Sequence, residues 1–432
     1  MTAPKRLLGV FALAAAAAFF LATVPYHRDW FDLRVYYDTA HHWLQDGGRI
    51  YDYRVPGKRY GFTYPPFAAL CMSPLAWLSW RSAVVAGLVV NAAAAAVVLA
   101  VLAGPAIRRH ARDRRAAYGV AACLFALLEP VRDTVSFGQV NLVLLALVLA
   151  DAQLLRGRHA RWAGAGIGIA AAVKLTPAIF ICYLLLARRP RNAALAAAVA
   201  LAATLLAGWA TPSSSLAYWT DALWDTDRIG RLAYVSNQSW EGVLARLAAP
   251  ADPSRIGWAV GVAAILCVWA RRAGRAARTG NHAAGFALTG AAACLISPVT
   301  WVHHLVWLAP ALAVLATAAL HRAPGRPRRR ALATAWAAYA LLCSSVVWLW
   351  FRDTSGADAF IGGSAYVWMT RALLLKLPLG SKHLAADQGV EHERAREQRQ
   401  PDGYEAEADD GRGGRRDRGS GSDERGDESR LH

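Results

Sequence analysis

The sequence predicts an all-α polytopic membrane protein. Hydrophobic residues make up 56% of its 432 residues, above the share of about 45–50% that soluble domains carry. Long apolar stretches recur along the chain and are separated by short segments rich in Lys and Arg. The six cysteines all lie in apolar stretches without the spacing of metal ligands, so they are predicted to be small buried side chains rather than a disulfide framework.

The apolar blocks predict the membrane-spanning helices. The first block follows a basic flank, which is also typical of a signal peptide, but an uncleaved first span is favoured because more spans follow. Several blocks are shorter than the roughly 20 residues that a full span needs. The blocks cover residues 7–24, 82–103, 116–130, 140–155, 162–187, 193–210, 256–270, 282–296, 305–320, 331–351 and 362–378.

The basic segments between the blocks predict the topology. Segments that carry several Lys or Arg next to a span stay in the cytoplasm, and Lys5 and Arg6 place the N-terminus there too. The remaining basic segments are residues 108–115, 156–161, 188–191, 271–278 and 321–330.

Two further assignments follow if all these basic segments lie on the cytoplasmic side. Block 162–187 has basic clusters at both ends, so it must be two short helices that turn near Lys174. Residues 67–80 cannot form a separate span, and they are predicted to be an outer juxtamembrane helix anchored by Trp77 and Trp80. About 12 spans result. Because Arg371 and Lys376 interrupt the last block, 11 spans and an outward tail stay open.

This topology predicts one transmembrane domain, residues 1–380, followed by a disordered, charged tail, residues 381–432. Its outer face includes a first extracytoplasmic loop with juxtamembrane helices, residues 25–81, and a second large loop, residues 211–256. Every carboxylate before residue 380 except Asp113 and Asp151 falls outside. Since positive-inside sorting does not require this, the outer face is predicted to be functional, although solvated loop charges would give the same pattern.

The net charge of +18 does not predict nucleic-acid binding. The basic residues lie mostly in short loops between helices, where topology and anionic inner-leaflet lipids account for them. Membrane lipids are therefore expected partners, and nucleic acid is not.

Short motifs along the outer face resemble those of glycosyltransferase family 87, the polyprenyl-phosphate-mannose-dependent α-1,2-mannosyltransferases of actinobacteria. The resemblance implies a GT-C-type fold, in which helical spans hold a lipid-linked sugar donor at the outer leaflet and an early loop supplies a catalytic carboxylate. The motifs are Asp-Leu-Arg-Val-Tyr (32–36), Tyr51-Asp52, Phe-Thr-Tyr-Pro-Pro (62–66), Glu129-Pro130, Gly-Gln-Val-Asn (138–141), Lys-Leu-Thr-Pro (174–177), Asn-Gln-Ser (237–239) and Ser-Pro-Val-Thr-Trp-Val-His-His (297–304).

Sugar transfer from a lipid phosphate to an alcohol needs a base for the acceptor hydroxyl and groups that stabilise the departing phosphate. Asp32 is the predicted base, because it opens the family-like pattern just after the first span. Asp38 is its rival. A role for Asp32 as the N-cap of a helix over residues 33–44 is the structural alternative.

The predicted donor site comes from later segments. Lys174 is expected to bind the donor phosphate, because an unpaired cation at this depth is costly; the alternative is snorkelling to lipid headgroups. His303 and His304 are expected to assist, although they could merely pack at the interface. Further donor contacts are expected from Gln139 and Asn141, which could instead cap a helix, and, through the resemblance, from Tyr36 and Tyr64.

The acceptor is expected at the second large loop. Trp240 could stack on a sugar, and Arg228 and Arg231 could meet an anionic headgroup, but an aromatic belt at the membrane surface predicts similar residues. No cofactor and no metal site is predicted. The spacing of Asp38, His41 and His42 lacks a further ligand, so dependence on a divalent metal is not expected.

The leading hypothesis is an inverting mannosyltransferase of the plasma membrane, acting at its extracytoplasmic face. It would move mannose from a polyprenyl-phosphate donor to a hydroxyl of a glycolipid or glycan. One alternative is an arabinofuranosyltransferase that uses decaprenyl-phosphate-arabinose. Another is a lipid or sugar transporter or flippase, which would more often show repeated halves and midplane binding residues. The acceptor, the linkage and the donor sugar stay open.

Overall fold

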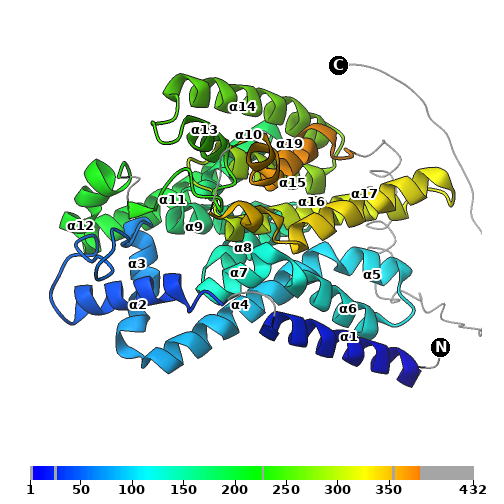
Figure 1. Cartoon of the computed structure of the whole chain (residues 1–432), viewed down its shortest axis with the longest axis horizontal. Helices are drawn as coiled ribbons and strands as arrows, with labels where there is room; N and C mark the ends of the chain where they lie inside the picture. The colour runs from blue at the N-terminus through cyan, green and yellow to red at the C-terminus, as the bar shows by residue number, and fades with distance from the viewer. Residues whose placement is uncertain (1–2, 24–26, 226–227, 353–355, 380–432) are drawn as a thin grey trace, which may run out of the picture. The chain divides into compact units, whose positions relative to one another are not determined.

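The computed structural model describes residues 3–23, 27–225, 228–352 and 356–379. The regular elements of these residues are helices (Figure 1), and apart from one isolated β-bridge between Arg54 and Gly61 the described residues contain no β-structure. The predicted tail, residues 381–432, lies outside the described residues. An all-α fold is thereby confirmed.

The helices of the first half are α1 (Ala3–Thr23), α2 (Phe31–Leu44), α3 (Pro66–Met72), η1 (Ser73–Trp77), α4 (Trp80–Leu102), α5 (Gly104–His110), α6 (Arg114–Leu127), α7 (Glu129–Phe137), α8 (Asn141–Leu154), η2 (Ala160–Trp162), α9 (Ala165–Val173), η3 (Thr176–Ala178) and α10 (Ile179–Leu186).

Those that follow are α11 (Pro190–Ala210), α12 (Pro212–Ala217), η4 (Tyr218–Ala222), α13 (Trp240–Ala248), α14 (Arg255–Arg278), α15 (His282–Ile296), η6 (Val302–Leu308), α16 (Ala309–Leu320), α17 (Arg326–Cys343), η7 (Val346–Trp350), α18 (Gly356–Gly362) and α19 (Ala365–Lys376).

Four described helical segments are long and apolar enough to cross a bilayer. They are α4, α11, α14 and the continuous segment formed by η6 and α16. On α4, the exposed side chains include Val85, Val89 and Val90, which suits contact with lipid tails. Other apolar helices have only 10–17 residues, less than the roughly 20 that a perpendicular span requires.

The predicted break and reversal at Lys174 is confirmed. Lys174 has an extended backbone, φ −150° and ψ 130°, which ends α9. The start of α9 lies beside the start of α11, where the Asn192 amide donates to the Ala163 carbonyl at 2.7 Å. Since α10 ends only four residues before α11 begins, both ends of the pair α9 and α10 meet the same end of α11, so the two helices run in opposite directions.

Residues 66–77 form two short helices, α3 and η1, rather than a span. The exposed ring of Trp77 ends this segment. Trp80, which was expected to anchor the same helix, instead begins α4, because the Ser79 hydroxyl accepts the Ser82 N–H and caps α4 at that point. The expected single helix over residues 67–80 is therefore shorter and in two parts.

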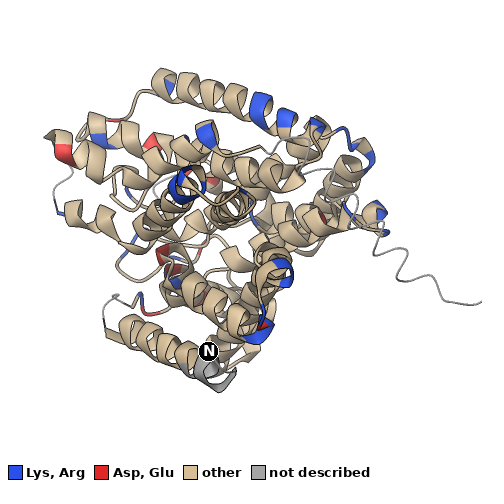
Figure 2. Ribbon diagram, turned by 90° about the vertical axis from the view of Figure 1, so that its right-hand side faces the viewer, with Lys and Arg blue, Asp and Glu red and all other residues tan. Residues whose placement is uncertain are grey.

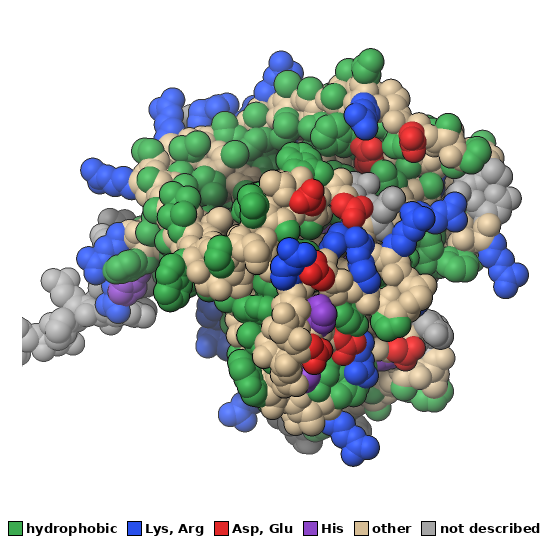
Figure 3. Space-filling model, turned by 90° about the vertical axis from the view of Figure 1, so that its left-hand side faces the viewer, with side chains coloured by type: hydrophobic (Ala, Val, Ile, Leu, Met, Phe, Trp, Pro, Cys, Tyr) green, Lys and Arg blue, Asp and Glu red, His purple; other side chains and the backbone are tan. Residues whose placement is uncertain are grey.

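Charges divide between the two ends of the helices. The end at the right of Figure 1, where α5 and the start of α17 lie, carries mainly Lys and Arg (Figure 2). The opposite end, where α2 and α12 lie, also carries Asp, Glu and His (Figure 3). The end with the acidic side chains is where the predicted site residues meet.

Candidate active site

Helix α2 brings Asp32 into the site. The two preceding residues, Asp29 and Trp30, have left-handed backbones with φ 51° and 56°, and the Trp30 N–H donates to the Ser136 carbonyl at 3.0 Å. The helix begins at Phe31, so Asp32 lies in its first turn. Asp32 is therefore not the N-cap of a helix that begins at residue 33, and that alternative is wrong.

Gly138 allows α2 to approach α7 closely. It ends α7 in the left-handed region, φ 71°, where a side chain is strained. A Cβ at Gly138 would lie 2.5 Å from the Cβ of Leu33, the residue after Asp32. The glycine thus sets Asp32 beside Gln139.

A chain of hydrogen bonds leads away from Asp32. The Gln139 side chain hydrogen-bonds the Asp32 carboxylate and accepts from the Tyr64 hydroxyl at 2.7 Å. The Tyr36 hydroxyl in turn donates to the Tyr64 oxygen at 3.0 Å. Because the Gln139 oxygen accepts from Tyr64, its amide nitrogen is the group that donates to Asp32. Gln139, Tyr36 and Tyr64 are buried, which holds this chain in one geometry.

Lys174 lies next to the same hydrogen-bonded chain, beside the Tyr64 ring. Its Nζ donates to Asn141 Oδ1 at 3.1 Å, lies 2.9 Å from His304 Nε2, and sits 5.1 Å from the centre of the Tyr64 ring. These contacts turn the ammonium inward rather than toward lipid headgroups. Asn141 is fully buried, and its side chain bonds Lys174 instead of capping α8.

The two histidines have different surroundings. His304 Nδ1 accepts the Trp301 backbone N–H at 3.2 Å, so the ring is held with Nε2 toward Lys174. His303 is buried against the Phe137 ring, 4.9 Å between centroids, and its carbonyl accepts from Thr134 at 3.1 Å. His304 therefore contacts Lys174 through its ring, whereas His303 holds α7 against the loop through its backbone.

Asn237 holds the loop that carries the histidines. Its amide nitrogen donates to the Pro298 carbonyl at 3.2 Å, and its oxygen accepts the Thr300 N–H at 2.9 Å. Asn237 is fully buried. Its motif was visible in the sequence, but a role in positioning residues 298–304 was not predicted, because the partners lie some 60 residues further along the chain.

Asp32 and Lys174 interact through their charges without forming an ion pair. No contact of 4.0 Å or less joins their charged atoms in the part of the chain that the structure describes, although the two charges interact. Burial raises the pKa of Asp32 to about 6, while the Gln139 hydrogen bond and the Lys174 charge oppose the rise. A carboxylate with such a pKa is suited to accept a proton near neutral pH.

Asp38, the rival base, lies apart from this group. Its carboxylate accepts from the Tyr53 hydroxyl at 2.9 Å and lies 3.9 Å from Arg34. Six residues along a helix place it about 240° around the axis from Asp32. Among the described residues, no three His, Cys, Asp or Glu side chains come together as metal ligands.

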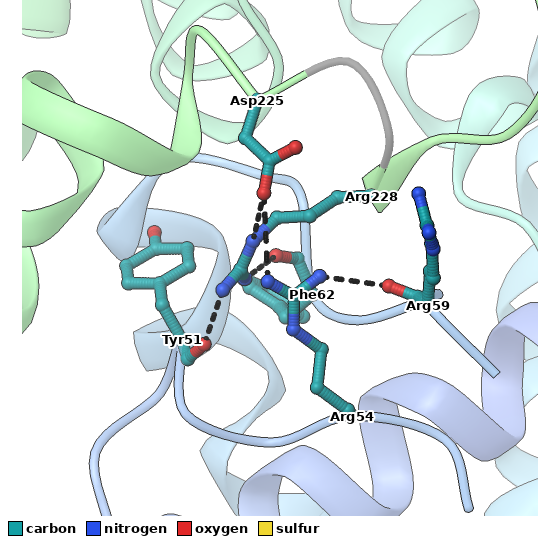
Figure 4. Close-up of polar contacts among 6 residues, drawn as sticks. All are labelled: Tyr51, Arg54, Arg59, Phe62, Asp225 and Arg228. Carbon is teal, nitrogen blue, oxygen red and sulfur yellow. Dashed lines mark hydrogen bonds and ion pairs between the residues drawn. The ribbon is translucent and has the colours of Figure 1, made fainter. Parts of the chain in front are cut away.

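The predicted acceptor residues also lie outside the group around Asp32. Arg228 is buried and donates to the Tyr51 carbonyl at 2.7 Å and the Phe62 carbonyl at 3.5 Å (Figure 4). Asp225 contacts both Arg228 and Arg54, at 3.3 and 3.4 Å. These contacts tie the second large loop to the first.

The other two candidates differ from Arg228. Arg231 is exposed, so its guanidinium is accessible. Trp240 packs on α14, where its ring N–H donates to the Gly257 carbonyl at 3.2 Å. Neither residue contacts Asp32 or Lys174.

Two buried acids on α7 were not predicted individually. The Glu129 carboxylate accepts from the Trp348 ring N–H at 2.5 Å and from the Tyr366 hydroxyl, and so joins α7 to η7 and α19. Asp133 lies 3.7 Å from Arg28, just before α2. Burial raises the pKa of Asp133 to about 7, and the Arg28 charge opposes the rise. Glu129-Pro130 was the visible signal, but only the fold shows its partners.

Comparison with known proteins identifies related sequences. The model of glycosyltransferase family 87 matches residues 62–298. A polyprenol-phosphate-mannose-dependent alpha-(1-2)-phosphatidylinositol mannoside mannosyltransferase of Mycolicibacterium smegmatis is 36% identical over 394 residues, 84% of this chain and 86% of the relative. Its namesake in Mycobacterium tuberculosis is 37% identical over 325 residues, 72% and 74% of the two chains.

A further relative carries a different acceptor in its name. It is the polyprenol-phosphate-mannose-dependent alpha-(1-2)-phosphatidylinositol pentamannoside mannosyltransferase of M. smegmatis, 34% identical over 79% of this chain and 81% of its own. No solved structure gives a significant match.

Proposed function

The chain belongs to glycosyltransferase family 87, and from that premise we propose that Asp32 is the base in a mannosyl transfer from a polyprenyl-phosphate donor. The chain is a membrane glycosyltransferase, so a transporter or flippase is no longer the better description. The curated relatives are named for polyprenol-phosphate-mannose, which favours mannose over arabinofuranose as the transferred sugar.

One observation supports the catalytic assignment above the others. Asp32 and Lys174, which are 142 positions apart by their residue numbers, meet around Tyr64 and Gln139 without contacting one another. In an inverting displacement, the base and the departing phosphate lie on opposite faces of the sugar. A carboxylate and an ammonium that lie near the same side chains without pairing are compatible with this requirement.

The proposed reaction uses Asp32 on one face of the sugar and Lys174 on the other. The Asp32 carboxylate removes the proton of the acceptor hydroxyl while that oxygen bonds C1 of mannose. The bond between C1 and the phosphate oxygen breaks, and polyprenyl phosphate leaves with the electron pair. Lys174 stabilises the negative charge that develops on the phosphate, and Asn141 and His304 orient its ammonium. Gln139, Tyr36 and Tyr64 fix the base and line the sugar site, and His303 supports the donor side through its backbone.

We further propose about 12 membrane crossings, with the site at the extracytoplasmic face. The reversal at Lys174 supports this topology, because the pair α9 and α10 then enters the membrane and returns to the side from which it came. The gathering of Lys and Arg residues at the opposite end (Figure 2) supports the orientation, since such residues remain in the cytoplasm. A reporter enzyme fused after Arg115 is expected to be active only in its cytoplasmic form.

The proposed acceptor is a mannose-bearing glycolipid, because the relatives are named for phosphatidylinositol mannosides. The test uses membranes that contain the full-length chain, radiolabelled polyprenyl-phosphate-mannose and a phosphatidylinositol mannoside. Wild-type membranes are expected to label the acceptor, and Asp32→Asn membranes are expected not to. Absence of transfer by the wild type to any mannose-bearing acceptor would contradict the proposed function.

A further inference from the structure

We propose that a cluster of aromatic side chains beside the candidate active site binds the carbohydrate part of the acceptor beyond the reacting hydroxyl. The aromatic cluster consists of Tyr60, Tyr234, Trp301, Trp348 and Phe351. The proposal rests on the proposed function, and it names the subsite that would receive the acceptor glycan.

Three of the other rings, from two later segments of the chain, pack around Tyr234. The Tyr234 ring lies 6.0 Å from Trp301, 6.0 Å from Trp348 and 5.9 Å from Phe351, each in an edge-to-face arrangement. Such geometry is the favoured one for aromatic pairs. The first loop, the second loop and two later outer segments therefore build one surface.

Gly230 joins Tyr60 to this surface. A Cβ at Gly230 would lie 3.2 Å from Tyr60 Cε1 and 3.5 Å from Trp301 Cζ2. The two rings thus flank a glycine whose backbone, with φ +120°, strains any other residue. Any side chain at position 230 would fill the space between the Tyr60 and Trp301 rings.

The cluster is partly open rather than a sealed core. Tyr60, Tyr234 and Phe351 are 37%, 38% and 53% exposed. The Tyr60 and Tyr234 hydroxyls make no hydrogen bond to a residue within the described ranges. Rings with accessible faces and hydroxyls without protein partners can serve a ligand that has both apolar C–H faces and hydroxyl groups.

The cluster also adjoins both sides of the candidate active site. The Tyr60 ring packs at 5.6 Å against Phe31, the residue before Asp32. The Trp301 backbone N–H holds His304, which contacts Lys174. An acceptor whose hydroxyl reaches Asp32 would extend its remaining sugar units over these rings.

A carbohydrate fits the cluster better than a lipid chain. Sugar rings present C–H faces that stack on aromatic rings, and their hydroxyls can bond the two phenols. Arg28 lies 4.6 Å over the Trp348 ring and 3.7 Å from Asp133, so its charge is shared with a carboxylate. A neutral glycan requires no further charge.

The test compares acceptor kinetics of full-length protein in nanodiscs at saturating donor, with octyl α-mannobioside as the acceptor probe. Tyr234→Ala and Tyr60→Ala are each expected to raise the acceptor KM by about tenfold, with kcat and the donor KM nearly unchanged. Tyr234→Phe keeps the stacking surface and is expected to recover most of the loss. Trp209→Ala is the matched control, because Trp209 is 83% exposed on α11.

Saturation-transfer NMR with methyl α-mannoside separates this proposal from the proposed function. The wild type is expected to transfer saturation to the sugar, and Tyr234→Ala is expected to lose most of that signal. Sugar binding without any mannosyl transfer would support the aromatic subsite and contradict the proposed function. Mannosyl transfer with an unchanged acceptor KM in both alanine variants would overturn the aromatic subsite and leave the proposed function standing.

Discussion

Lys174 Nζ lies 2.9 Å from His304 Nε2, although the two residues belong to segments 130 positions apart. The Trp301 N–H binds the other ring nitrogen of His304, so the ring cannot turn away without losing that contact. Lys174 also donates to Asn141 Oδ1 at 3.1 Å, so two side chains hold its amine at this position.

Asp32→Asn is expected to lower kcat for mannosyl transfer by about 10²–10⁴-fold, the usual contribution of a general base, while the donor KM changes little. Asp38→Asn is the matched control, and it is expected to retain activity within a few-fold, because Asp38 bonds Tyr53 and Arg34 instead. Steady-state assays in nanodiscs measure both. Full activity of Asp32→Asn combined with loss in Asp38→Asn would reverse the assignment.

The direction in which Asp32→Asn changes the stability of the protein can be predicted. The folded-state pKa of Asp32 is raised from 3.8 to about 6, so the stability that its acid form provides is lost as the pH rises through about 6. The neutral amide avoids that loss. The melting temperature of Asp32→Asn at pH 7.5 is thus expected to equal or exceed that of the wild type, and a clear decrease would point to a structural role.

The pH dependence of kcat follows from the same pKa. Asp32 acts as a base only when ionised, so kcat is expected to increase with pH below about 6 and to level off above it. Gln139→Met removes a hydrogen bond to the ionised form, and Lys174→Met removes a favourable charge. Each is expected to move the midpoint to higher pH. If neither variant moved the midpoint, the pH dependence of kcat would not report the ionisation of Asp32.

Gly138→Ala is expected to destabilise the protein and to reduce kcat. It combines the cost of a left-handed backbone, about 1–3 kcal/mol, with a clash against Leu33, and so displaces Asp32 from Gln139. Gly47→Ala is the matched control, because Gly47 has φ +73° and nothing within 4 Å of its would-be Cβ. Thermal unfolding and kcat are measured together, and equal kcat in the two variants would show that the Leu33 contact does not position the base.

Arg228→Met is expected to loosen the first loop, because it leaves the Tyr51 and Phe62 carbonyls without their donor. The cost expected for such buried groups is about 1–3 kcal/mol. Hydrogen exchange of residues 51–62 should become faster, whereas Arg231→Met, at an exposed position, should leave it unchanged. An increased acceptor KM without faster exchange would instead support direct contact between Arg228 and the acceptor.

Much of the architecture could be predicted from the chain alone, because apolar length and the positions of Lys and Arg constrain where helices lie and which ends remain together. The reversal at Lys174 followed from basic clusters at both ends of one block. The residues around the site could be named individually, since polar groups in apolar surroundings are costly and few. The sequence favoured Asp32 over Asp38 through its motif, but it did not show which of the two lies near Lys174, since that depends on how α2 packs against the other helices.

By itself, the sequence determined that this protein is helical and lies in the membrane, and it predicted that most carboxylates before residue 380 lie around one end of the helices. These properties depend on composition and periodicity, which each segment carries locally. Only the tertiary structure decided that Asp32 reaches Gln139, that Arg228 ties two loops together and that three aromatic rings pack around Tyr234. Such contacts join residues far apart in the chain, and they depend on how closely helices approach, as at Gly138 against Leu33.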